Sequence, residues 1–138
     1  MSIRPFRDIK RRKTKVINVG EVKVGGDNPI SVQSMTNTLT TDVKATINQI
    51  NDIAEEGADI VMIKPGLPYL DIIRSVKNNF KIPIFSYQVS GEYSLIKNGI
   101  KKRIINEDAI LESLVSLKRG GSNAIVTYFA LEVANQLK

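Results

Sequence analysis

The sequence contains no cysteine and no histidine among its 138 residues. Disulfides, thiolate or imidazole metal sites, cysteine-held iron–sulfur clusters and catalytic schemes based on Cys or His are therefore excluded for these residues. Tryptophan is also absent, and aromatic residues make up only 6% of the chain. Any catalysis has to use lysine, tyrosine, serine, aspartate or glutamate, and we expect no metal ligands.

Long apolar runs are absent as well. No segment approaches the roughly 20 apolar residues that a membrane-spanning helix needs. The opening residues, MSIRPFRDIKRRKTK, lack the apolar core of a secretory signal. With 42% hydrophobic and 25% charged residues, the composition is that of a soluble globular chain of about one domain. We expect a cytoplasmic protein without a membrane partner.

The net charge of +6 is concentrated in a basic tail over residues 1–15, which holds seven of the 20 Lys and Arg residues. A second basic cluster, at residues 97–103, falls on or just after a predicted helix. The second cluster has no interleaved aromatic residues that could stack on bases. We therefore expect a solvated surface or a subunit contact at both places, and no nucleic-acid partner.

Short apolar runs alternate with amphipathic stretches through the rest of the chain. Four strands are predicted, over residues 29–35, 59–63, 84–89 and 124–128. Helices are predicted after them, over about 42–56, 69–80, 91–101 with 106–119, and 130–137. A hairpin is predicted before them, over 16–19 and 22–24.

Strand followed by helix, four times over, predicts an α/β fold with a parallel sheet and right-handed crossovers. Four such units are half of an eight-stranded TIM barrel, so we expect a partial barrel with a short N-terminal β-hairpin. Barrel enzymes gather their reactive side chains at the carboxyl ends of the strands. These strand ends are therefore where we look for a site.

Lys64 stands at the end of the most apolar of these strands. The run IVMI before it is typical of a strand that is buried on both faces. Because side chains alternate along a strand, Ile60, Met62 and Lys64 share one face. An amine in a dry apolar recess is a nucleophile, whereas the alternative is a solvated lysine leaving the strand.

An internal repeat brings a second residue to an equivalent strand end. Residues 57–64 (GADIVMIK) align with residues 121–128 (GSNAIVTY) at an offset of 64, which makes Tyr128 the counterpart of Lys64. Tyr87 and Ser90 lie at the end of the strand between them. These hydroxyls could hold a carboxylate and relay protons beside an imine-forming lysine. Alternatively, the tyrosines are ordinary strand residues and Ser90 is a helix cap.

Three segments after residue 57 resemble porphobilinogen synthase (5-aminolevulinate dehydratase). They read VMIKPGLPYLDIIR (61–74), YQVSGEY (87–93) and TYFA (127–130), in the order and spacing of that family's C-terminal third. LESL (111–114) with Lys118-Arg119 continues the match. The resemblance implies that Lys64 forms a Schiff base with 5-aminolevulinate, that Ser90 and Tyr128 hold the substrate's carboxylate, and that Tyr87 lines the same pocket.

The segment before residue 57 resembles a different family, 4-hydroxy-3-methylbut-2-enyl diphosphate synthase. The segments that carry this resemblance are RRK (11–13), VGGD (24–27), PISVQSMTNT (29–38) and TTDV (40–43). The junction falls near residues 56–61, so we interpret the chain as a chimera joined in register. This interpretation divides it into a basic tail (1–15), an isoprenoid-synthase-like hairpin and first unit (16–56), and a porphobilinogen-synthase-like part (57–138).

Both resemblances are incomplete. The porphobilinogen synthase pattern includes a second active-site lysine and, in many members, a zinc-binding cysteine segment, and neither is found here. The residues present bind no cofactor, although the resemblance implies zinc or magnesium in the complete enzyme. The cluster-binding cysteines and several arginines of the isoprenoid enzyme are also missing.

Three functions follow as hypotheses. The first is a porphobilinogen-synthase-like fragment of haem biosynthesis, with imine chemistry at Lys64 and 5-aminolevulinate as the substrate. The second is an isoprenoid-pathway fragment. The third is a non-catalytic chimera that only associates with itself, because a half barrel leaves two sheet edges open. We expect a homo-oligomer or association with a full-length homologue.

Overall fold

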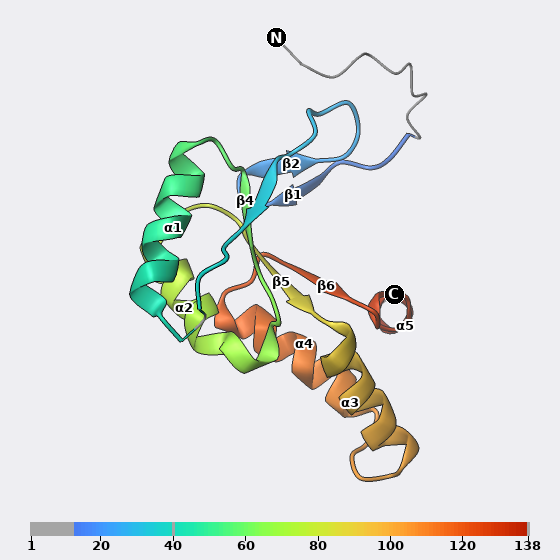
Figure 1. Cartoon of the computed structure of the whole chain (residues 1–138). Helices are drawn as coiled ribbons and strands as arrows, with labels where there is room; N and C mark the ends of the chain where they lie inside the picture. Colours follow the sequence, from blue (N-terminus) through green and yellow to red (C-terminus); the bar gives the residue numbers. More distant parts are fainter. Residues whose placement is uncertain (1–12, 40, 138) are drawn as a thin grey trace.

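A two-stranded hairpin precedes a four-stranded parallel sheet flanked by helices in the computed structural model, which describes residues 13–39 and 41–137 (Figure 1). The predicted α/β class, parallel sheet and N-terminal hairpin are confirmed. Most of the predicted tail lies outside the described residues. The two parts of the predicted chimera share one sheet, because Gln33 pairs with Ile60.

The hairpin consists of β1 (Ile17–Val19) and β2 (Val22–Val24), paired antiparallel as the alternating valines predict. Its turn contacts the start of the main sheet, since a Cβ atom on Gly20 would lie 3.2 Å from the Pro83 ring. Val19 is buried, with 4% of its surface exposed. The hairpin is therefore packed near the amino end of the sheet, opposite the predicted site.

All four strands of the main sheet run parallel and follow one another in chain order. They are β3 (Gln33–Met35), β4 (Ile60–Ile63), β5 (Ile84–Gln88) and β6 (Ala124–Thr127). The first strand is shorter than the predicted 29–35, because among the described strands β3 pairs with β4 alone, over Gln33–Met35. Ile30 and Val32 consequently remain exposed.

In the described part of the chain, five α-helices follow the strands, at the positions that the amphipathic pattern predicts. They are α1 (Val43–Glu55), α2 (Leu70–Asn79) after the 3₁₀ turn η1 (Leu67–Tyr69), α3 (Ser90–Lys101), α4 (Asp108–Gly120) and α5 (Ala130–Gln136). Asp42 caps α1, accepting from the Ala45 N–H at 2.9 Å. Helix α4 begins at Asp108, two residues later than the predicted start at residue 106, and its N-cap is Glu107.

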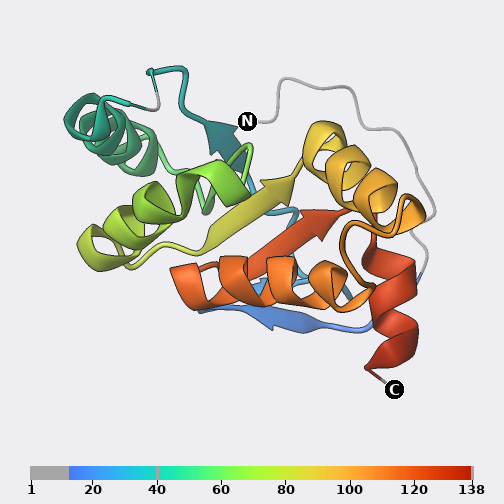
Figure 2. The ribbon, with the colours of Figure 1, turned by 90° about the horizontal axis from the view of Figure 1, so that it is seen from below.

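The core lies between one face of the sheet and three helices (Figure 2). Val61, Ile63 and Ile84 point to this face and are buried. They form one cluster with Ile50 of α1, Ile72, Ile73 and Val76 of α2, and Ile110, Leu114 and Leu117 of α4. The helices therefore cover one side of the sheet, as in a barrel wall.

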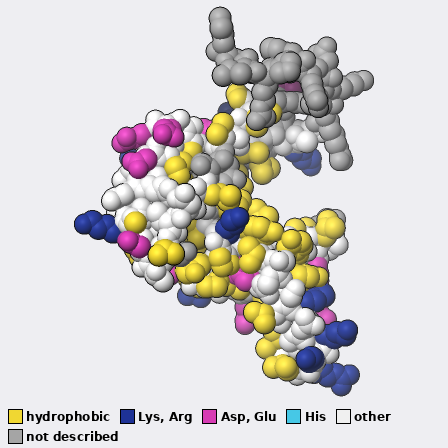
Figure 3. Space-filling model, in the orientation of Figure 1, with side chains coloured by type: hydrophobic (Ala, Val, Ile, Leu, Met, Phe, Trp, Pro, Cys, Tyr) yellow, Lys and Arg dark blue, Asp and Glu magenta, His cyan; other side chains and the backbone are white. Residues whose placement is uncertain are grey.

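The opposite face of the sheet is apolar but more open. By alternation it carries Met35, Met62, Phe85 and Val126, of which Met35 is 47% and Val126 40% exposed. Figure 3 shows hydrophobic side chains gathered along the hollowed side of the molecule. We call this face the open face.

Candidate active site

The predicted site residues lie at the carboxyl edge of the sheet, at the ends of three adjacent strands. Ile63 pairs with Ser86 and Tyr87 pairs with Val126, so the ends of β4, β5 and β6 lie at similar heights. By alternation, Lys64 and Tyr87 both belong to the open face. The parallel arrangement on which the site depends is therefore present.

Lys64 is exposed, and the expected dry recess around it is wrong. Its side chain borders a small hollow of about 70 Å³ between the ends of β3 and β4, together with Met35, Thr36, Thr38 and Met62. Lys64 is open to water because this edge of the open face has no second layer of described side chains over it. The hollow lies on the β3 side of Lys64, whereas the tyrosines lie on the β5 and β6 side.

Tyr87 and Tyr128 are brought together, as the shared strand-end location predicts. The Tyr87 hydroxyl donates to the Tyr128 hydroxyl at 3.2 Å. Tyr93 of α3 extends this pair into an aromatic cluster, with its ring 5.4 Å from Tyr128 and 4.6 Å from Phe129. Because Tyr87 is the donor, the Tyr128 proton is free to point to a ligand, and Tyr128 is 58% exposed.

The contact between the two tyrosines raises the pKa of Tyr87, first through the hydrogen bond and then through burial and the charge of Tyr128. Only the protonated Tyr87 can donate, so the bond favours the neutral form.

We therefore expect Tyr128→Phe to lower the pKa of Tyr87 towards its ordinary value. Because the folded-state pKa is raised, the stabilisation is complete below the unfolded pKa of about 10 and is lost as the pH rises through the folded value. NMR titration of ring-labelled tyrosine measures both the wild type and the variant. An unchanged Tyr87 pKa in the variant would contradict the hydrogen bond.

Ser90 lies at the same edge, directly after β5, but it is not the predicted helix cap. It is exposed and is the first residue of α3, whose N-cap is Val89. The capping acceptor is the Glu92 side chain, which takes the Val89 N–H at 2.7 Å. The Ser90 hydroxyl is therefore not needed for capping.

Glu92 is the residue that the sequence interpretation missed. It is 8% exposed and also accepts from the Leu67 N–H at 2.7 Å and the Gly66 N–H at 3.3 Å. A glutamate three positions into a helix that follows a strand is a known capping signal. That signal predicts the bond to Val89 and gives no indication of the bonds to the loop after Lys64.

A second missed feature is a polar network on the helix side of the sheet. The buried Gln88 donates to the Ser113 hydroxyl at 2.9 Å and accepts from the Thr127 hydroxyl at 2.7 Å. Thr127 in turn accepts from the Phe129 N–H at 3.1 Å. The network therefore fixes the backbone on both sides of Tyr128.

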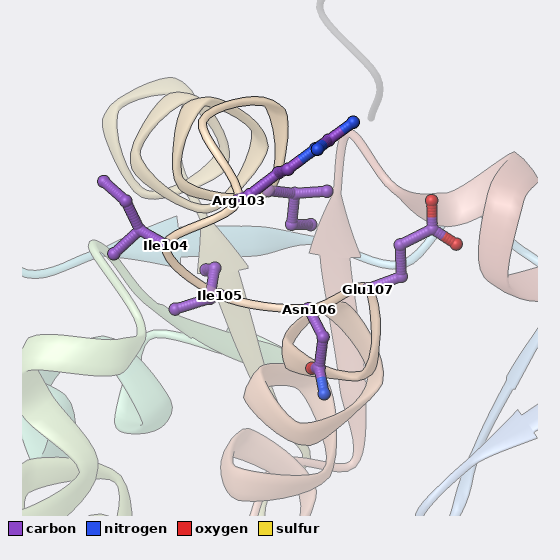
Figure 4. Close-up of a pocket in the computed structure, with 6 residues that line it drawn as sticks. Arg103, Ile104, Ile105, Asn106 and Glu107 are labelled. Carbon is purple, nitrogen blue, oxygen red and sulfur yellow. The ribbon is translucent and has the colours of Figure 1, made fainter.

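Other features of the described residues do not add a site. The turn between α3 and α4 forms an open groove of about 480 Å³, whose labelled side chains point in different directions (Figure 4). Within residues 13–39 and 41–137, no group of three or more acidic, His or Cys side chains could hold a metal ion. None of the helices in this part of the chain has the length and hydrophobicity to cross a membrane.

Comparisons with known proteins point to a single family. The model of the family described as delta-aminolevulinic acid dehydratase matches residues 5–136. The delta-aminolevulinic acid dehydratase of Archaeoglobus fulgidus is 48% identical over 95 residues, which cover 69% of this chain and 30% of the relative. The chloroplastic enzyme of Spinacia oleracea is 58% identical over 83 residues, covering 59% and 19%.

A solved structure agrees with these relatives. The delta-aminolevulinic acid dehydratase (porphobilinogen synthase) of Toxoplasma gondii ME49, in complex with the reaction product porphobilinogen, aligns with a TM-score of 0.70 and 39% identity. The alignment covers 72% of this chain and 28% of that one, so the chain spans less than a third of the length of these relatives. The comparisons give no support to the isoprenoid resemblance or to a chimera, because the family match already begins at residue 5.

Proposed function

This chain belongs to the delta-aminolevulinic acid dehydratase family, and we propose that it is a porphobilinogen-synthase-like fragment whose Lys64 forms a Schiff base with 5-aminolevulinate. The observation that carries the proposal is the placement of Lys64 on the strand next to the Tyr87–Tyr128 pair, at the carboxyl edge of a parallel sheet. This is the edge at which barrel enzymes hold their chemistry. We place the activity in haem biosynthesis and in the cytoplasm.

The proposed step is imine formation. The neutral Lys64 amine attacks the ketone carbon of 5-aminolevulinate, a C–N bond forms, and the carbonyl oxygen leaves as water. Tyr128, whose proton is not used by Tyr87, donates to the substrate carboxylate together with the Ser90 hydroxyl. Tyr87 lines the same pocket and holds the Tyr128 oxygen in place.

Zinc or magnesium, which the family resemblance implies for the complete enzyme, does not fit the residues described here. The chain has no Cys or His, and the described acidic side chains form no metal-holding group. The proposed imine formation therefore uses only side chains of this chain. Condensation of two substrate molecules is expected to be weak or absent in the isolated chain.

Borohydride trapping tests the proposal. Reduction of the imine leaves a stable adduct whose mass is that of one substrate, minus one water, plus two hydrogens. No adduct on the folded protein would overturn the proposal. Binding of inorganic diphosphate, which the isoprenoid alternative for residues 16–56 requires, is expected to be negligible.

We also propose that the four parallel units are half of a barrel and that a second copy covers the open face. Two copies related by a two-fold axis that runs in the direction of the strands would have their open faces towards each other. Together they would supply eight parallel strands, the number in a closed barrel. The exposed apolar residues Met35 and Val126 support this pairing, and it would give Lys64 the cover that the single chain lacks. A full-length homologue is the alternative partner.

We expect Val126→Asp to reduce self-association, because it places a charge on the open face, at its exposed edge strand β6. Sedimentation velocity over a range of concentrations measures the effect. Val115→Asp is the matched control, since Val115 is 43% exposed on α4 and Val126 is 40% exposed on β6. A wild-type protein that stays monomeric, or an equal response of the two variants, would contradict pairing through this face.

A further inference from the structure

We propose that Glu92 is a positioning residue for Lys64, acting through the loop that follows the lysine. The inference rests on the proposed function and goes beyond it, because it assigns the placement of the amine to a side chain that does not itself react. One carboxylate joins the backbone that follows Lys64, at Gly66 and Leu67, to Val89, the residue before Ser90.

The contacts of Glu92 come from two separate segments. Its Oε1 accepts from the Leu67 N–H at 2.7 Å, and its Oε2 accepts from the Val89 N–H at 2.7 Å and the Gly66 N–H at 3.3 Å. Gly66 and Leu67 lie 26 and 25 positions earlier in the chain than Glu92. The two oxygens therefore connect the end of β4 to the start of α3.

Helix capping alone does not account for this arrangement. Capping α3 needs only the bond to Val89, which an exposed carboxylate could also make. Glu92 is instead buried, with 8% of its surface exposed. Burying a carboxylate lowers the stability of the fold unless several donors form hydrogen bonds to it. The additional donors are the backbone amides of the loop next to Lys64, so the burial of this charge is coupled to the loop's conformation.

The loop is also held from its other side. Gly66 is buried against α4, and a Cβ atom on it would lie 2.9 Å from a methyl group of the buried Leu117. The backbone beyond Lys64 is thus fixed between the Glu92 carboxylate and the α4 surface. Lys64 itself is exposed, so its position depends on this backbone and not on packing around its side chain.

Glu92→Gln tests the inference because it keeps the size of the side chain while replacing one acceptor oxygen with an NH₂ donor. We expect the maximal rate of borohydride-trapped imine formation with 5-aminolevulinate to fall by about 10- to 100-fold, as for a displaced reacting group. The half-saturating substrate concentration should change much less, because the binding hydroxyls remain.

Asp42→Asn is the matched control. The Asp42 carboxylate caps α1 with a single bond to Ala45, and its replacement makes the same chemical change at a helix start. We expect this control to change thermal stability little, because Asn caps a helix about as well as Asp, and to leave the trapping rate unchanged. A merely structural role for Glu92 would make the two variants alike once their rates are compared at temperatures where both are folded.

Hydrogen exchange of the wild-type protein gives a second measurement that does not depend on whether the variant folds. The Gly66 and Leu67 amides should be protected in the wild type. In Glu92→Gln, which keeps one acceptor oxygen, the protection of at least one of the two should fall while that of Ala45 is kept. Unprotected Gly66 and Leu67 amides in the wild type, or wild-type trapping kinetics in Glu92→Gln, would overturn the positioning role and leave the proposed function standing. A wild-type protein that forms no adduct would overturn both.

Discussion

Lys64→Ala is expected to abolish the trapped 5-aminolevulinate adduct while leaving the fold intact. The loss should be complete because the adduct is proposed to form at the Lys64 amine, which the substitution removes. Lys64 is exposed and makes no contribution to the core, so the free energy of unfolding should change by no more than about 0.5 kcal/mol. Intact-mass spectrometry after borohydride reduction and urea unfolding measure the two quantities.

Lys81→Ala is the control for this experiment. Lys81 is also exposed, but it precedes β5 and therefore lies at the amino edge of the sheet, away from the proposed site. We expect it to form the adduct to the wild-type extent. Adduct formation by Lys64→Ala, or equal loss in the two variants, would mean that the chemistry is not located at Lys64.

Phe129→Ala is expected to destabilise the protein by about 3–5 kcal/mol, the cost of removing a fully buried phenylalanine. Phe129 has no exposed surface, belongs to the core cluster and packs its ring 4.6 Å from that of Tyr93. A domain of this size has only about 5–15 kcal/mol of stability in total, so such a change removes a large share of it. Urea unfolding followed by circular dichroism measures the loss.

Leu131→Ala provides the comparison for Phe129→Ala. Leu131 lies two positions further along and is 83% exposed, so its truncation should change the stability by no more than about 0.5 kcal/mol. If both variants unfolded at the wild-type urea concentration, Phe129 would not hold α5 against the sheet. The aromatic contacts that place Tyr128 would then lose their structural basis.

The order and direction of the main elements follow from local patterns in the sequence. The run IVMI before Lys64 is apolar on both faces because its alternate residues meet the helices and the open face. Asp42 caps α1, and Gly57, with a φ of 94°, ends that helical segment, as such residues do at helix termini. Four consecutive strand–helix units then predict a parallel sheet.

The features that the sequence did not predict all depend on contacts between distant segments. The capping signal at Glu92 gives no information on the bonds to Gly66 and Leu67, because those donors belong to another loop. The exposure of Lys64 depends on whether another layer covers the open face, and that is a property of the assembly and not of local sequence. The apolar residues next to Lys64 in its strand correctly predicted that Lys64 belongs to the open face. They did not predict that its side chain is exposed to water.

Part of the site could nevertheless be predicted from the internal repeat and the alternation of side chains along the strands. The offset of 64 residues between the two glycine-initiated strands puts Tyr128 at the strand end equivalent to Lys64. The register then brings Tyr128 within hydrogen-bonding distance of Tyr87. Ser90 was placed at the correct edge by its position at the end of β5, and the alternative role as a helix cap is filled by Glu92.

The most direct test of the account is peptide mapping of the wild-type chain after reduction with borohydride in the presence of 5-aminolevulinate. The account predicts one modified peptide, with the adduct on Lys64 and the same lysine unmodified when the substrate is omitted. Adducts spread over other exposed lysines such as Lys77, Lys81 and Lys97, or no adduct on the folded protein, would contradict it.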